Sequence, residues 1–191
     1  MGTTTRGPIE ALLEEVRQEA GRLDDGAVAT YIPELAKADP SVFGLGLATL
    51  DGQVYTTGTL VPFTIQSVSK PYVYALALAD RGAAAVEARV GSEPTGDPFN
   101  SIALDPVTGR ASNPMVNAGA IVTSSLVGGA DRAAQFDRIL GGLSAFAGRD
   151  LEVDESVYVS ERDTGDRNRA IAYLMRSAGL LDEDVDAQVE L

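Results

Sequence analysis

Ser67 and Lys70 are the two side chains whose types and spacing best suit covalent catalysis. They form a Ser-x-x-Lys pattern directly before an apolar stretch at residues 71–79. If Ser67 lies at the start of a helix, the residue three positions on lies on the same face, so the lysine amine can reach the serine hydroxyl. Apolar surroundings lower the pKa of an amine, which allows it to act as a general base. The Ser67 backbone N–H, near a helix N-terminus, can also stabilise a developing oxyanion. The pattern therefore predicts a serine nucleophile activated by a lysine.

The composition leaves few other residues for such chemistry. The 191 residues include no His and no Cys, which excludes histidine bases, thiol nucleophiles, disulfides and the common zinc sites. Catalysis must then use Ser, Lys, Tyr, Asp, Glu or backbone groups. Lys37 and Lys70 are the only lysines among 15 basic residues. The position of Lys70 beside an apolar segment therefore suggests a catalytic role for it.

Each candidate residue also has a simpler structural explanation. Ser-x-x-Lys occurs by chance in many proteins, and Ser67 can be a helix N-cap with Lys70 in solvent. Asn117, at the entrance of a second apolar segment, can be an N-cap or can bind a substrate carboxylate or amide. Glu161 belongs to a charged run at residues 160–168, which is typical of a solvated loop but can supply a carboxylate for an ammonium group. Taken singly, each residue favours the structural explanation.

The hydrophobic pattern predicts the elements that must position these residues. A β-hairpin is expected over residues 42–58, with Asp51-Gly52 as a two-residue turn in which both residues take a positive φ. Residues 91–114 are rich in Gly, Pro, Asn, Asp and Ser and indicate a long ordered loop. Helical periodicity is found over residues 8–23, 29–37, 71–81, 117–127, 132–146 and 167–177.

Charge and hydropathy exclude two classes of partner. The chain carries 28 acidic and 15 basic residues, a net charge of −13, whereas a nucleic-acid-binding protein needs a basic footprint. No apolar run reaches the ~18 residues of a membrane span, and acidic residues stand where a signal peptide would be apolar. We therefore expect a cytoplasmic protein with no nucleic-acid partner and no membrane partner.

Several longer motifs follow one another from about residue 28 onward. They are YIPEL at 31–35, LDG at 50–52, QSVSKP at 66–71, VGSEPTG at 90–96, FN at 99–100, NPMVNAGA at 113–120 and SERDTGDRN at 160–168. Together they resemble the serine-dependent glutaminase family. The resemblance implies an α/β (α+β) fold like that of serine β-lactamases and penicillin-binding proteins, a mixed sheet with a helical subdomain. It also implies hydrolysis of L-glutamine to L-glutamate and ammonia through an acyl-enzyme, with no metal and no organic cofactor.

The resemblance assigns a role to each matching residue. Ser67 is expected to be the catalytic nucleophile and Lys70 its activating base. Glu161 suits the α-ammonium group of the substrate, and the amides of Asn117 and Asn168 suit its α-carboxylate. The family's glutamine-binding positions match Tyr31, Gln66, Ser67, Asn117, Glu161 and Asn168.

The resemblance also predicts the domain organisation. We expect an N-terminal helix and linker over residues 1–27 and a glutaminase domain over residues 28–191 that is incomplete at its C-terminus. Family members continue past the position of Leu191 with further strands, two substrate-contacting tyrosines, a Lys-Ser-Gly-like motif and an oxyanion-hole amide. Because the hairpin would then lack neighbouring strands, we expect the 191-residue chain alone to be inactive or poorly folded. A homo-oligomer is expected, since family members often form homotetramers.

Two alternatives remain open. The Ser-x-x-Lys pattern also fits a β-lactam-recognising or peptidase-like enzyme, which a penicillin would label at Ser67. The other alternative is a truncated, non-catalytic fragment. It would oligomerise through its acidic segment 150–191 and an exposed strand edge, and the substitution Ser67→Ala would not affect it.

Overall fold

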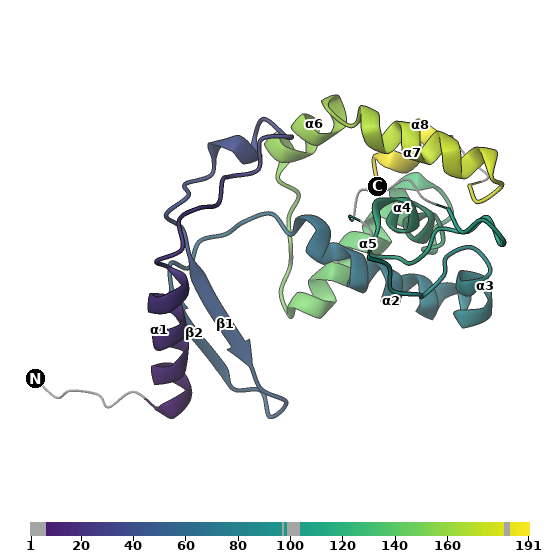
Figure 1. The fold of residues 1–191 in the computed structure, drawn as a ribbon. Coiled ribbons are helices and arrows are strands. Elements are labelled where there is room, and N and C mark those ends of the chain that lie inside the picture. Colours follow the sequence, from purple (N-terminus) through teal and green to yellow (C-terminus); the bar gives the residue numbers. More distant parts are fainter. Residues whose placement is uncertain (1–6, 97, 99–103, 182–183) are drawn as a thin grey trace, which may run out of the picture. The chain divides into compact units, whose positions relative to one another are not determined.

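The computed structural model describes residues 7–96, 98, 104–181 and 184–191 and divides the chain into two compact units. The N-terminal unit, Met1–Thr64, contains helix α1 (Pro8–Ala20), the 3₁₀ turn η1 (Leu35–Lys37) and strands β1 (Gly44–Ala48) and β2 (Val54–Gly58). The helical unit, Ile65–Leu191, contains the 3₁₀ turn η2 (Gln66–Val68) and helices α2 (Ser69–Arg81), α3 (Ala83–Glu87), α4 (Asn117–Ser125), α5 (Arg132–Ala147), α6 (Glu155–Asp163), α7 (Asp166–Ser177) and α8 (Val185–Val189) (Figure 1).

The predicted β-hairpin is confirmed, but its turn differs from the expected one. β1 and β2 pair in antiparallel register along their full length. The turn closes through the Thr49 N–H, which donates to the Gln53 carbonyl at 2.9 Å, and through the Gly52 N–H, which donates to the Thr49 carbonyl at 2.9 Å. Gly52 has a positive φ of 87° and Asp51 does not. The expected two-residue turn is therefore wrong, because a three-residue loop needs one left-handed residue to match the twist of the strands.

Helix α1 packs against the hairpin, chiefly along β2. Its Glu14 carboxylate accepts from the Arg17 guanidinium at 2.6 Å and from the Thr57 hydroxyl of β2 at 2.5 Å. These donors, the Arg17 bond first, hold the pKa of the Glu14 carboxyl far below its usual range. Within the described residues the sheet consists of these two strands, with α1 as the helix that packs on it.

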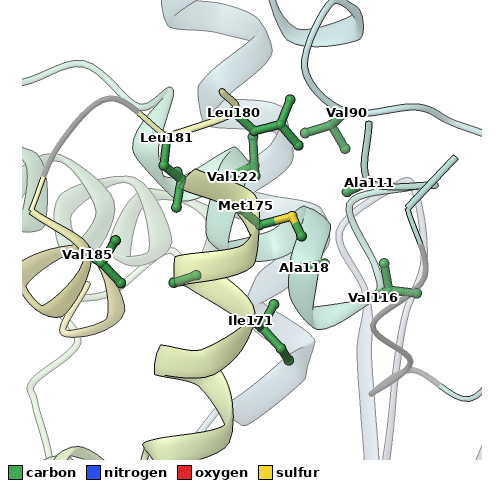
Figure 2. Close-up of a cluster of buried hydrophobic side chains, with 11 residues drawn as sticks. Val90, Ala111, Val116, Ala118, Val122, Ile171, Met175, Leu180, Leu181 and Val185 are labelled. Atoms are coloured by element: carbon green, nitrogen blue, oxygen red, sulfur yellow. The ribbon is translucent and has the colours of Figure 1, made fainter. Parts of the chain in front are cut away.

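The larger core of the helical unit lies between α4, α7 and α8. Ala118 and Val122 are one turn apart on α4, and Ile171 and Met175 are one turn apart on α7; all four are fully buried. Figure 2 shows the Met175 side chain reaching from α7 toward Ala118. The spacing of four residues gives each helix one apolar face, and burying these faces fixes α4 and α7 relative to each other.

A second core cluster joins α2, α3 and α5. Leu76 and Ala77 of α2, Val86 of α3 and Ile139 of α5 are buried together. Gly142 of α5 allows the close approach, because a Cβ at that position would lie 2.5 Å from a methyl carbon of Leu76. This cluster anchors α2, the helix that carries Lys70.

Helices near residues 8–23, 71–81, 117–127, 132–146 and 167–177 are confirmed, but the helix over residues 29–37 is wrong. Only η1 forms there, and it buries no side chain. Such a short segment makes too few hydrogen bonds to offset the cost of nucleating a helix.

The interpretation of residues 160–168 as a loop is also wrong. Residues 160–163 complete α6, which begins after Asp154, whose carboxylate accepts from the N–H groups of Ser156 and Val157. Only residues 164–165 separate α6 from α7. The FN motif at residues 99–100 lies outside the described residues. None of the described helices is long and apolar enough to cross a membrane.

Candidate active site

Ser67 lies in the 3₁₀ turn that leads directly into α2. The Val68 N–H donates to the Ile65 carbonyl at 3.1 Å, and the Ser69 N–H donates to the carbonyls of Gln66 and Ser67, so the turn and the helix form one continuous coil. Ser67 is exposed, and Lys70 follows in the first turn of α2. Residues three apart in such a coil share a face, which places the hydroxyl and the amine on the same side of the helix start.

The residue before Ser67 has an unusual backbone conformation. Gln66 has a φ of 47°, the one positive φ of a non-glycine residue in the described part of the chain. A non-glycine residue in this region costs on the order of 1–3 kcal/mol and persists where surrounding contacts hold it. The Gln66 side chain supplies one such contact, since its Nε2 donates to Glu161 Oε1 at 2.7 Å. The sequence carries no signal for this conformation, because glutamine has no preference for positive φ.

The Lys70 amine faces two neutral acceptors. Its Nζ donates to the Met115 carbonyl at 2.9 Å and to Asn117 Oδ1 at 2.8 Å. The side chain is partly buried, and this burial lowers the pKa of the amine. A neutral amine has two N–H groups and one lone pair, so it can keep both of these hydrogen bonds after losing its proton. The geometry therefore tolerates the deprotonated form that a base requires.

Asn117 connects Lys70 to the start of α7. Asn117 is the first residue of α4, and the N-cap position belongs to Val116, so the alternative in which Asn117 serves as an N-cap is wrong. Its Oδ1 accepts from Lys70 while its Nδ2 donates to Asn168 Oδ1 at 3.2 Å. Because the Asn168 oxygen takes part in this contact, the amide N–H groups of Asn168 face away from Asn117 and can donate to a ligand.

The structure brings the predicted site residues of the helical unit into two bonded groups. Lys70, Asn117 and Asn168 form one group, on α2, α4 and α7, and Gln66 and Glu161 form the other, on η2 and α6. Ser67 lies between Gln66 and Lys70 in sequence. Tyr31 belongs to the N-terminal unit, where its side chain is 68% exposed.

The Met115 carbonyl is a site group that the sequence does not reveal. A backbone acceptor has no residue signature, and the only hint is the Asn113-Pro114 pair, which is typical of a turn. Among the described residues, no cluster of acidic side chains could bind a metal ion.

The comparisons with known proteins agree with these motifs. The family model of the glutaminases matches residues 26–191. The chain belongs to the glutaminase family. Glutaminase 1 of Bradyrhizobium diazoefficiens is 51% identical over 99% of this chain and 31% of its own length. The glutaminase of Clavibacter michiganensis is 53% identical over 95% of this chain and 54% of its own length. The chain thus spans about a third to a half of these relatives.

Solved glutaminase structures have the same fold. The protein Mglu, solved in its tris and glutamate form, superposes with a TM-score of 0.90 at 43% identity, over 97% of this chain and 42% of its own. A probable glutaminase from Bacillus subtilis, in complex with 6-diazo-5-oxo-L-norleucine, gives a TM-score of 0.80 at 29% identity, over 100% of this chain and 58% of its own. The expected α+β fold of the glutaminase type is therefore confirmed.

Proposed function

We propose that the protein hydrolyses L-glutamine to L-glutamate and ammonia, with Ser67 as nucleophile and Lys70 as its base. The observation that carries the proposal is the partly buried Lys70 amine, held by two neutral acceptors one helical turn after an exposed serine. The names of the relatives support the substrate, because the chain is 51% and 53% identical to proteins called glutaminases.

In the first half of the reaction the Ser67 hydroxyl attacks the γ-carboxamide carbon of glutamine. Lys70 takes the hydroxyl proton as the new C–O bond forms, and the carbonyl oxygen becomes an oxyanion. The Ser67 N–H, close to the positive end of α2, is a donor for that oxyanion. Collapse of the intermediate breaks the C–N bond, the proton on Lys70 passes to the leaving nitrogen, and ammonia departs. Ser67 is left as a γ-glutamyl ester.

The second half reverses these roles with water as the nucleophile. Lys70 takes a proton from water, the hydroxide oxygen adds to the ester carbon, and the C–O bond to Ser67 breaks. The proton on Lys70 returns to the serine oxygen, and glutamate is released. Because the base ends each half-reaction neutral, its two acceptors must hold it without favouring the ammonium form as strongly as a carboxylate would.

The polar residues around the dyad suit the two ends of an amino acid. Glu161 has a carboxylate for the substrate α-ammonium, with its Oε1 already oriented by the Gln66 amide. The amides of Asn117 and Asn168 can donate to the α-carboxylate. The family motif also assigns glutamine binding to Tyr31. Mglu in its glutamate form and the Bacillus subtilis protein with a glutamine-like diazoketone support such a ligand.

The wider setting is also part of the proposal. We propose that residues 28–191 are the glutaminase domain after an N-terminal helix and linker over residues 1–27, and that the protein acts in the cytoplasm as a homo-oligomer with four subunits. A net charge of −13 disfavours a nucleic-acid partner, since phosphate groups would be repelled. Light scattering coupled to size exclusion tests the subunit number, and a monomer mass would contradict it.

A chimera tests the activity in a complete glutaminase. Residues 1–191 replace the matching segment of the Clavibacter michiganensis enzyme, which is 53% identical. We expect the chimera to release ammonia from L-glutamine and Ser67→Ala to abolish the release while the circular dichroism spectrum is unchanged. A folded chimera without activity, or an active Ser67→Ala variant, would contradict the proposal.

A further inference from the structure

The Asn113 carboxamide makes three hydrogen bonds at the turn before α4. Its Oδ1 accepts from the N–H groups of Met115 at 3.0 Å and Val116 at 3.2 Å. Its Nδ2 donates to the Glu93 carbonyl at 2.9 Å, in the loop before the turn. One side chain thus satisfies two successive backbone donors and ties the turn to a segment 20 residues earlier in the chain.

This turn carries the carbonyl that Lys70 uses. The Met115 N–H bonds to Asn113, and the Met115 carbonyl accepts from Lys70 Nζ at 2.9 Å. The backbone of the turn also rests on α4, since a Cβ on Gly119 would lie 2.0 Å from the Asn113 carbonyl oxygen. The orientation of the Met115 carbonyl therefore depends on contacts that Asn113 makes on both sides of the turn.

We propose that Asn113 is a positioning residue for the base: by holding residues 113–116 it aims the Met115 carbonyl at the Lys70 amine. The inference rests on the proposed function, in which that amine takes the Ser67 proton. Acceptors held in fixed positions restrict the direction of the lone pair of a neutral amine, and Asn113 holds one of these acceptors in place. Without it, the Lys70 amine loses one of the fixed contacts that set its orientation.

The scarcity of lysine makes the test direct. Lys37 and Lys70 are the only lysines in the sequence, so the 191-residue chain labelled with ¹³C-lysine shows two ε-carbon environments. A side chain held in one orientation gives two separate Hε signals, whereas a rotating one averages them. We expect separate signals for Lys70, which merge in Asn113→Ala. Lys37 is the internal reference, because its 69% exposed side chain is remote in sequence from the turn.

Two further variants separate positioning from stability. Asn113→Ser keeps a short acceptor for the turn N–H groups and should retain most of the Lys70 signal separation. Ser144→Ala removes a similar side-chain bond, that from the Leu151 N–H at 3.0 Å, away from the turn and should leave the Lys70 signals unchanged. A folded Asn113→Ala chain with unchanged Lys70 signals would overturn the inference. If Asn113→Ala does not fold, a folded Asn113→Ser chain in which the Lys70 signals merge although the turn acceptor is kept would overturn it instead.

Kinetics in the chimera complete the test. We expect Asn113→Ala to lower kcat by about tenfold or more while KM for glutamine changes by less than about threefold, since the base and not the binding groups is displaced. An equal loss in the Ser144→Ala chimera would overturn the positioning role. Failure of the proposed function is distinguishable, because it would leave the parent chimera inactive while the Lys70 signals still respond to Asn113→Ala.

Discussion

The two lysines of the chain lie in opposite environments. Lys37 is bound to the Glu34 carboxylate at 2.5 Å, and its side chain is 69% exposed. Lys70 bonds to a carbonyl and an amide oxygen and is partly buried. The same residue type is therefore a surface ion-pair partner at one position and a candidate base at the other.

Burial of Lys70 predicts a particular pH dependence. A base acts only when neutral, and burial lowers the pKa of Lys70 below the ordinary 10.5. Activity should therefore rise with pH through a midpoint below 10.5 and level off above it. The measurement is kcat/KM of the chimera for glutamine across pH. If kcat/KM does not rise with pH below pH 10.5, Lys70 is not the base.

Replacement of each lysine by arginine gives a matched pair of variants. A guanidinium stays protonated at all working pH values, so Lys70→Arg should reduce kcat of the chimera by roughly 10²–10⁴. Lys37→Arg keeps the charge that pairs with Glu34 and should leave kcat unchanged. Comparable activity in the two variants would show that Lys70 is not the base.

At the scale of single residues, the sequence predicts which residues are neighbours along one helix. It does not predict which side chains of different helices come into contact. The Ser67–Lys70 pair follows from a spacing of three residues in a continuous coil. The contact of Asn117 with Asn168 joins residues 51 positions apart, and the contact of Gln66 with Glu161 joins residues 95 apart. Such contacts arise from the packing of α4 on α7 and of other helices, which no local pattern encodes. The family resemblance named these residues without giving their partners.

The first turn of α4 is the element on which the candidate site depends most. It carries Asn117 at its first position, and its buried face packs against α7, which carries Asn168. Gly119 lets the preceding turn lie directly on the helix, because a Cβ at this position would lie only 2.0 Å from the Asn113 carbonyl oxygen. The placement of Asn117 therefore depends on a glycine two residues further along the helix.

Alanine at two helical glycines tests this close approach. Gly119→Ala forces backbone atoms apart and should destabilise the chain by about 1–3 kcal/mol. Gly141→Ala, in the exposed part of α5, meets no atom within 4 Å and should stabilise it by about 0.5–1 kcal/mol through helix propensity. Urea unfolding of the two variants provides the measurement. Equal effects of the two substitutions would contradict the packing described for the turn.

Element prediction succeeded where a local pattern decides the structure. The two strand-like runs on either side of Asp51-Gly52 predicted the hairpin, and helical periodicity predicted α1, α2, α4, α5 and α7. The turn type was wrong because loop length depends on how the strands pair. Helix α6 was missed because its charged residues resemble a loop, although Asp154 followed by Ser156 is a capping signal.

Across the whole chain, acidic residues outnumber basic ones by a wide margin. A net charge of −13 produces self-repulsion in the compact state, and salt screens such repulsion between exposed charges. We expect raising NaCl from about 10 mM to about 500 mM, which shortens the screening length several-fold, to increase Tm by at least about 2 °C. Thermal melts followed by circular dichroism measure this. A fall in Tm would mean that attractive ion pairs, such as Arg138 with Asp80 at 2.8 Å, dominate instead.

The most direct test of the central claim is covalent labelling of the serine. 6-Diazo-5-oxo-L-norleucine, the ligand of the Bacillus subtilis relative, carries a glutamine-like amino-acid end and a diazoketone that alkylates an activated nucleophile with loss of N₂. The chimera is incubated with this compound, digested and mapped by tandem mass spectrometry. We predict one adduct, on Ser67, which is absent in Ser67→Ala and much slower to form in Lys70→Arg. An adduct on another residue, or labelling of Ser67 at an equal rate in Lys70→Arg, would contradict the account.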